Sequence, residues 1–173
     1  MRTWAASAQA RIHGGRGPAS KSAFVVAVQT SAEGKPRFMR LTPIGAFTNQ
    51  SLKDWAASHL IPTAHVVCDG LQCFKQVSPL GATHQRDVTG GGQAAQTPQL
   101  RWVNTVPGNL KTALAGTYHS FDHAKYGARY LAEFAYRFNR RFDLPAMVPR
   151  LLWAAAAIKP QPLKILRWSE AGK

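Results

Sequence analysis

The stretch AHVVCDG at residues 64–70 decides how this sequence folds. Residues 64–68 are a short apolar, β-branched run, which predicts a buried strand that ends abruptly at Asp69 and Gly70. A carboxylate at the end of a buried strand lies at a sheet edge, where loops converge and oxygen ligands can hold Mg²⁺. The alternative is an ordinary Asp-Gly turn, and this fragment alone leaves both interpretations open.

Two upstream runs predict the neighbours of this strand. Residues 24–29, FVVAVQ, have the composition of a buried strand, and EGKP at 33–36 turns the chain into another strand at 37–42. Residues 50–60 carry apolar side chains at three- and four-residue steps, with Ser51 as a fair N-cap. We therefore expect a hairpin followed by a short helix.

From Val103 onward the spacing of apolar residues becomes helical. The strongest pattern spans 125–142, where aromatic residues recur every four positions until Pro145 ends the helix. A last helix is expected at about 147–158, and the Gly-rich stretch 81–99 is expected to be a loop. Strands first and helices afterwards indicate an α/β fold.

Asn104 and Lys111 stand seven residues apart in WVNTVPGNLKTAL. On a helix this spacing is almost two full turns, so both side chains face the same way. An amide oxygen can ligate a metal and a lysine can hold a phosphate, although ordinary helix surface produces the same pair. Pro107 is compatible if the helix begins near Val103, because a first-turn proline loses no hydrogen bond.

The charge of the chain points to a polyanionic partner. The 173 residues are enough for one domain with a real core, and 22 Lys and Arg against 8 Asp and Glu give +14. Residues 1–53 hold eight bases and one acid (+7), 54–120 four and three (+1), and 121–173 ten and four (+6). Nucleic acid is the first expectation; a merely soluble cationic domain and an anionic membrane surface are the alternatives. No stretch joins a strong apolar face to a dense basic face, which argues against the membrane.

Several protein classes are excluded by composition. The longest apolar run, at 151–158, is far shorter than the roughly 20 residues that cross a bilayer, and residues 1–10 contain no signal-peptide stretch. Cys68 and Cys73 cannot build a disulfide framework, and no CxxC pair exists for a zinc ribbon. We therefore expect a cytoplasmic protein.

Several blocks taken together resemble bacterial insertion-sequence transposases of the ISXO-type DDE group. They read GRGPASKSAFVVAVQT at 15–30, CDGLQCF at 68–74, VNTVPGNLK at 103–111, GTYHSFDHAKY at 116–126 and RYLAEFAYRFNRRFDL at 129–144. The resemblance implies an RNase H-like, integrase-like α/β domain, a mixed sheet flanked by helices. It also implies a phosphoryl-transfer enzyme that cuts transposon ends and joins the 3′ hydroxyl to target DNA with two Mg²⁺ ions.

The resemblance assigns roles to individual residues. Asp69 matches the second acidic metal ligand, Asn104 stands in the place of the third, and Lys111 matches a lysine that contacts DNA near the reacting phosphate. His84 and His119 also fall on family-like positions. Since lone histidines are more often structural or DNA-facing than ligands, we assign His119 to DNA binding and leave His84 open.

The charged face of the 125–142 helix is the second expected contact with DNA. Arg137, Arg140 and Arg141 are assigned to this contact. Glu133 is expected to pair with Arg129 or Arg137, four residues away, instead of serving as a spare acid.

The chain departs from the family at its start. Family members carry their first catalytic Asp on the opening strand in a DDAYxGG-like block, whereas no Asp here precedes Asp54 and MRTWAASAQA at 1–10 does not resemble that strand. We therefore expect an N-terminally truncated transposase: a basic flexible segment at 1–22, a partial RNase H-like domain at 23–158 without its first catalytic strand, and a basic tail at 159–173.

This departure has chemical and structural consequences. One carboxylate and one amide hold two Mg²⁺ ions poorly, so we expect weak or absent Mg²⁺ binding and no activity. A missing central strand would expose sheet edges and favour a homo-oligomer.

Three functions stay open: an inactive transposase catalytic-domain fragment, a non-catalytic basic DNA-binding protein that regulates an intact transposase, and an unrelated RNA- or DNA-binding module. The core spacing of the aromatic residues argues against the last.

Overall fold

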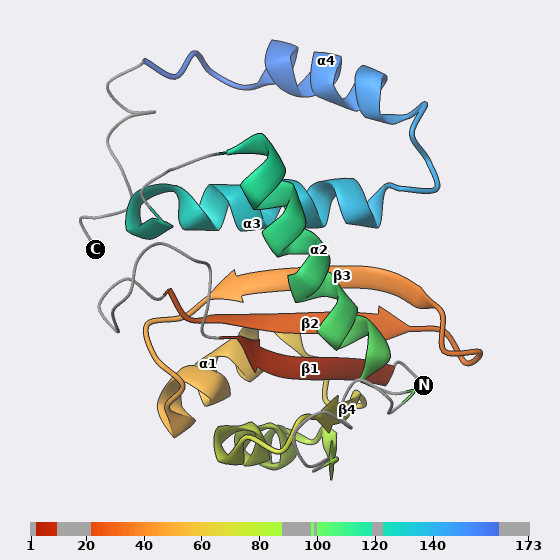
Figure 1. The fold of residues 1–173 in the computed structure, drawn as a ribbon, viewed down its shortest axis with the longest axis vertical. Helices are drawn as coiled ribbons and strands as arrows, with labels where there is room; N and C mark the ends of the chain where they lie inside the picture. Colours follow the sequence, from red (N-terminus) through yellow and green to blue (C-terminus); the bar gives the residue numbers. More distant parts are fainter. Residues whose placement is uncertain (1–2, 10–21, 88–97, 99, 119–122, 163–173) are drawn as a thin grey trace.

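The structure is a computed structural model that describes residues 3–9, 22–87, 98, 100–118 and 123–162. It is a mixed sheet with helices on both faces (Figure 1). In chain order the elements are β1 (Thr3–Gln9), β2 (Phe24–Thr30), β3 (Pro36–Pro43), α1 (Asn49–His59), β4 (His65–Cys68), the 3-10 helix η2 (Gln72–Leu80), β5 (Thr83–Arg86), α2 (Arg101–Thr117), α3 (His123–Asn139) and α4 (Met147–Ala157).

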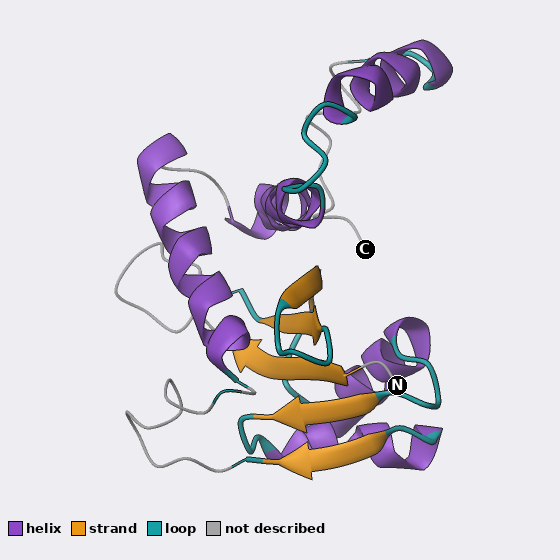
Figure 2. Ribbon diagram, turned by 90° about the vertical axis from the view of Figure 1, so that its right-hand side faces the viewer, coloured by secondary structure: helices purple, strands orange, loops and turns teal. Residues whose placement is uncertain are grey.

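The five strands have the order β3-β2-β1-β4-β5. The strands β1, β4 and β5 run parallel to one another, whereas β2 is antiparallel to both β1 and β3. Helix α2 covers one face of the sheet, and α1 and η2 cover the other (Figure 2). This arrangement confirms the expected α/β class.

The central strand is β1, so the expectation that the domain lacks its opening strand is wrong. All seven residues pair with β2, from Thr3 opposite Thr30 to Gln9 opposite Phe24, and Ala6 also pairs with Cys68 of β4. The sequence TWAASAQ has low strand propensity, but pairing on both sides overrides propensity in a central strand. Within the segment 1–22 that was expected to be flexible, residues 3–9 form a strand. The domain therefore begins before residue 23. Residues 10–21 and 163–173 lie outside the described residues.

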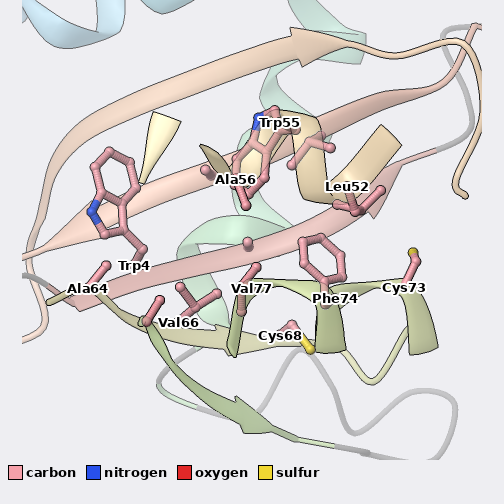
Figure 3. Packing of buried hydrophobic residues seen from close by; sticks show 14 residues of the cluster. Trp4, Leu52, Trp55, Ala56, Ala64, Val66, Cys68, Cys73, Phe74 and Val77 are labelled. Carbon is pink, nitrogen blue, oxygen red and sulfur yellow. The ribbon is translucent and has the colours of Figure 1, made fainter. Parts of the chain in front are cut away.

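A first apolar cluster lies between the sheet and α1 with η2. The indole of Trp55 meets the ring of Phe74 edge-on at 6.4 Å between centroids, and Phe74 is completely buried. Figure 3 shows these rings together with Trp4 of β1 and Val66 of β4. Since η2 supplies Phe74, this unpredicted helix closes one face of the domain.

Strand β5 corrects a second expectation, because its residues fall in the stretch 81–99 expected to be a loop. It pairs with β4 from His65 opposite Thr83 to Cys68 opposite Arg86. Its sequence, THQR, is polar because an edge strand with exposed residues buries little. The pairing brings the residues after β4 and β5 to the same end of the sheet.

The end of α3 covers the outer edge of β3. The side chain of Asn139 accepts a hydrogen bond from the main-chain N–H of Met39 at 2.7 Å and donates one to the carbonyl of Met39 at 2.9 Å. The guanidinium of Arg141 donates to the carbonyls of Pro36 and Phe138. Asn139 thus satisfies edge groups that would otherwise be open to another strand.

Replacing Asn139 by alanine is expected to destabilise the domain by about 1–3 kcal/mol, because the partly buried main-chain groups of Met39 lose their partners. Urea unfolding measures the loss. Asn109→Ala on the exposed surface of α2 is the matched control and should change the free energy of unfolding by less than about 0.5 kcal/mol. Equal, small changes in both variants would contradict a role for Asn139 at the sheet edge.

Candidate metal and nucleic-acid site

Asp69 lies directly after β4, at the centre of the parallel part of the sheet. It is exposed, and it follows Cys68, the partner of Ala6 in β1. Continuing this register by one residue brings the backbone of Ser7 level with Asp69. The strand beside Asp69 therefore supplies TWAASAQ, which contains no carboxylate.

Asn104 lies on α2, which packs on the face of the sheet that carries Val67 of β4. The helix buries Val103, Val106 and Leu110 in a second apolar cluster that also contains Val67 of β4. Asn104 is half-buried at the border of this cluster, and Asp69 follows Val67 by two residues. Each predicted ligand is thus close in sequence to a member of this cluster, and their joint role as metal ligands stays a prediction.

Lys111 follows Asn104 by almost two turns of α2 and is exposed. The helix begins at Arg101, so Pro107 lies inside it and not in the first turn as expected. Pro107 has no N–H and so removes one main-chain hydrogen bond from the helix. Its ring is buried, as is the side chain of the neighbouring Val106. The proline therefore does not prevent Asn104 and Lys111 from sharing a helix.

Asp87 is a carboxylate at this end of the sheet that sequence reasoning missed. Its main-chain N–H donates to the carbonyl of Cys68 at 2.9 Å, which extends the pairing of β4 and β5 by one step. Asp87 is half-buried. The carboxyl ends of neighbouring parallel strands meet at one edge, so identifying β5 in the sequence would have identified Asp87 as well.

The donor groups at this edge do not fit a pair of Mg²⁺ ions. Asp69 and Asp87 contribute carboxylates and β1 contributes no acid, while Asn104 of α2 would add only a neutral amide. Among the described residues, no three or more His, Cys, Asp or Glu side chains gather where they could hold a metal ion. Two hard divalent ions need more charged oxygen ligands than this set provides.

His84 lies on the other face of the sheet. It pairs with Val66, which belongs to the cluster beneath α1, and its Nε2 lies 3.0 Å from Sγ of Cys68. Burial lowers the pKa of His84, with Arg86 and Lys75 adding to the effect, and burial raises the pKa of Cys68. Both shifts favour the neutral forms of the two side chains, and the contact ties His84 to Cys68, a member of the cluster beneath α1.

The arginines of the α3 end have different surroundings. Arg137 forms the expected ion pair with Glu133 at 2.7 Å, with both side chains about half exposed. Arg140 stacks on Tyr136 at 3.7 Å from the ring centroid. Arg141 is held against β3, and its pKa is lowered by burial and by the nearby Arg37. The DNA contacts expected of these arginines stay a prediction, and His119 lies outside the described residues.

Comparisons with known proteins bear on this arrangement. Residues 3–139 match the ISXO2-like transposase domain. The fold is similar to the crystal structure of the catalytic core domain of BIV integrase, with a TM-score of 0.51 and 16% identity over 80% of this chain and 83% of that chain. Among curated proteins, none shows significant sequence similarity. No described helix has the length and hydrophobicity required to cross a membrane.

Proposed function

Because this chain belongs to the family of ISXO2-like transposase domains, we propose that it binds DNA in the context of transposition but does not cut DNA on its own. The observation that carries the proposal is the composition of β1: the central strand is folded, yet it offers no carboxylate beside Asp69. The family reaction uses two metal ions held by carboxylates. A domain with its fold retained and its ligand set reduced is suited to binding without catalysis.

The side of the domain formed by α2 and α3 supports DNA binding. Lys111 and Arg137 are exposed on these two helices, and the rings of Tyr118 and Tyr130 lie 4.2 Å apart between centroids, which holds the end of α2 against α3. Cations on two adjoining helices can contact successive phosphates. On the opposite face, Lys53 of α1 is exposed next to the acidic Asp54.

The test combines binding and cleavage on one set of complexes. Lys111→Ala is expected to weaken binding to duplex DNA about 5- to 10-fold, as for the loss of one phosphate contact, whereas Lys53→Ala should change affinity less than about twofold. The same complexes, incubated with Mg²⁺, should yield no nicked or joined product.

Each part of this test has an opposing result. Equal effects of Lys111→Ala and Lys53→Ala would contradict the assignment of the DNA surface to α2. Cleavage by the wild-type chain that disappears in Asp69→Ala would contradict the inactivity and place a working metal site at Asp69.

A further inference from the structure

The ring of Phe142 lies in solvent just beyond the end of α3. The residue is 86% exposed. Main-chain hydrogen bonds from Arg141 to Phe138 and from Asp143 to Arg140 hold the turn that carries it. The aromatic side chains within α3 are only half exposed or less, and several pack against the second apolar cluster. Phe142 therefore offers a ring surface that the aromatic residues at core spacing do not.

A guanidinium supports one face of this ring. Arg141 lies over the ring of Phe142 at 4.3 Å and over the ring of Phe138 at 3.9 Å from the centroids. The same guanidinium donates to the carbonyls of Pro36 and Phe138, which fixes its position. Phe138 in turn packs against the second apolar cluster. The exposed ring is thus held on a fixed cation, and its outer side is open to another planar group.

The surroundings of the ring are strongly basic. Residues 35–40 hold three bases and no acid, and residues 137–143 hold three bases and one acid, which together give +5. The hydrogen bonds between the end of α3 and β3 bring these two segments side by side. Arg140 lies over Tyr136 at 3.7 Å, and its buried Nε has no hydrogen-bond partner among the described residues. An anionic ligand that carries planar groups matches both features of this surface.

We propose that Phe142 stacks on an unpaired base of single-stranded DNA, with the neighbouring arginines on the phosphates beside that base. The internal bases of a duplex are already stacked on both faces, so a base must be unpaired or terminal to lie on a protein ring. This site lies beside β3, which two strands separate from the β4 strand that precedes Asp69. The inference rests on the DNA binding proposed above and names the form of DNA that this end of the domain selects.

Fluorescence anisotropy with three labelled probes tests the site. The probes are a blunt duplex, the same duplex with a thymidine overhang of about five nucleotides, and the duplex with an abasic overhang of equal length and charge. The wild type is expected to bind the thymidine overhang about 10-fold more tightly than the abasic one, the effect of one stacked base. Phe142→Ala should bind both overhangs alike and keep the wild-type affinity for the blunt duplex, whereas Phe142→Trp should keep the preference.

Leu144→Ala is the matched control, because it removes an apolar side chain that is 60% exposed two residues away. It should leave the affinity for every probe unchanged. If the blunt duplex is bound but the wild type does not distinguish the two overhangs, the stacking site is overturned and the proposed function stands. The same conclusion follows if the preference persists in Phe142→Ala or is lost equally in Leu144→Ala. If the wild type binds none of the probes, the proposed function fails together with the site.

Photo-crosslinking locates the base on the protein. A 5-iododeoxyuridine in the overhang couples on irradiation to the aromatic side chain on which it stacks. Trypsin cuts after Arg141 and Arg150, so the peptide 142–150 contains Phe142 as its only aromatic residue. The crosslink is expected in this peptide of the wild type and should be absent from Phe142→Ala. A crosslink that forms in a different peptide instead would assign the unpaired base to another surface and overturn the proposal.

Discussion

Replacing Phe74 by alanine is expected to lower the free energy of unfolding by about 3–5 kcal/mol, because the change empties a fully buried site. Phe74 lies in η2 and meets Trp55 of α1 edge-on, so its removal separates the two elements that close one face of the sheet. A loss of this size is a large fraction of the stability of an ordinary domain. The variant should be partly unfolded at physiological temperature.

Urea and thermal unfolding of the wild type and two variants measure this effect. Phe142→Ala removes the same ring from a position that is 86% exposed, where the ring lies against the guanidinium of Arg141. Its cost should therefore stay below about 1 kcal/mol. If Phe74→Ala proves no more destabilising than Phe142→Ala, η2 does not pack on the sheet as described.

Affinity for duplex DNA is expected to fall about 1,000-fold between 50 and 200 mM salt. This is the response of a protein that neutralises six or so phosphates, and a chain with 22 bases against 8 acids has the charges to do so. Lys111→Ala should reduce the slope of log K against log salt by about one contact. Fluorescence anisotropy with a labelled duplex at several salt concentrations gives both numbers.

A salt-independent affinity would contradict this account of binding. If the wild type shows a steep dependence of log K on log salt and Lys111→Ala shows the same slope, the DNA binds to another basic surface. Lys53→Ala on the α1 face is again the control, because it changes the net charge of the chain equally without removing a cation from the α2 side.

The elements predicted correctly are those whose own residues show the apolar pattern of a strand or a helix. The run FVVAVQ became β2 because five of its residues are buried between two apolar clusters, and the aromatic spacing beyond 125 became α3. The strand β1 was missed because alanine and serine carry no strand pattern and the pairing partners are distant in sequence. Strand β5 was missed because an edge strand keeps its polar residues in water.

The candidate site was predictable only in part for the same reason. Local features drew attention to Asp69 and Asn104 but left an Asp-Gly turn and ordinary helix surface as alternatives, and the resemblance to the family assigned their roles. Asp87 depends on β5, which the sequence did not reveal. The sequence NRRF suggested a DNA contact, whereas Asn139 and Arg141 bond to the edge of β3, a long-range contact without a local pattern.

The proposed lack of catalysis follows from β1, which brings no carboxylate beside Asp69 to complete a set of metal ligands. Calorimetric titration with Mg²⁺ and Mn²⁺ tests this directly in the wild type, Ser7→Asp and the uncharged control Ser7→Asn. We expect no saturable binding below about 1 mM in the wild type or in Ser7→Asn. Ser7→Asp should bind at least about 10-fold more tightly than this limit, since charged oxygen ligands govern the binding of hard cations. Tight binding of two ions by the wild type, abolished in Asp69→Ala, would contradict it.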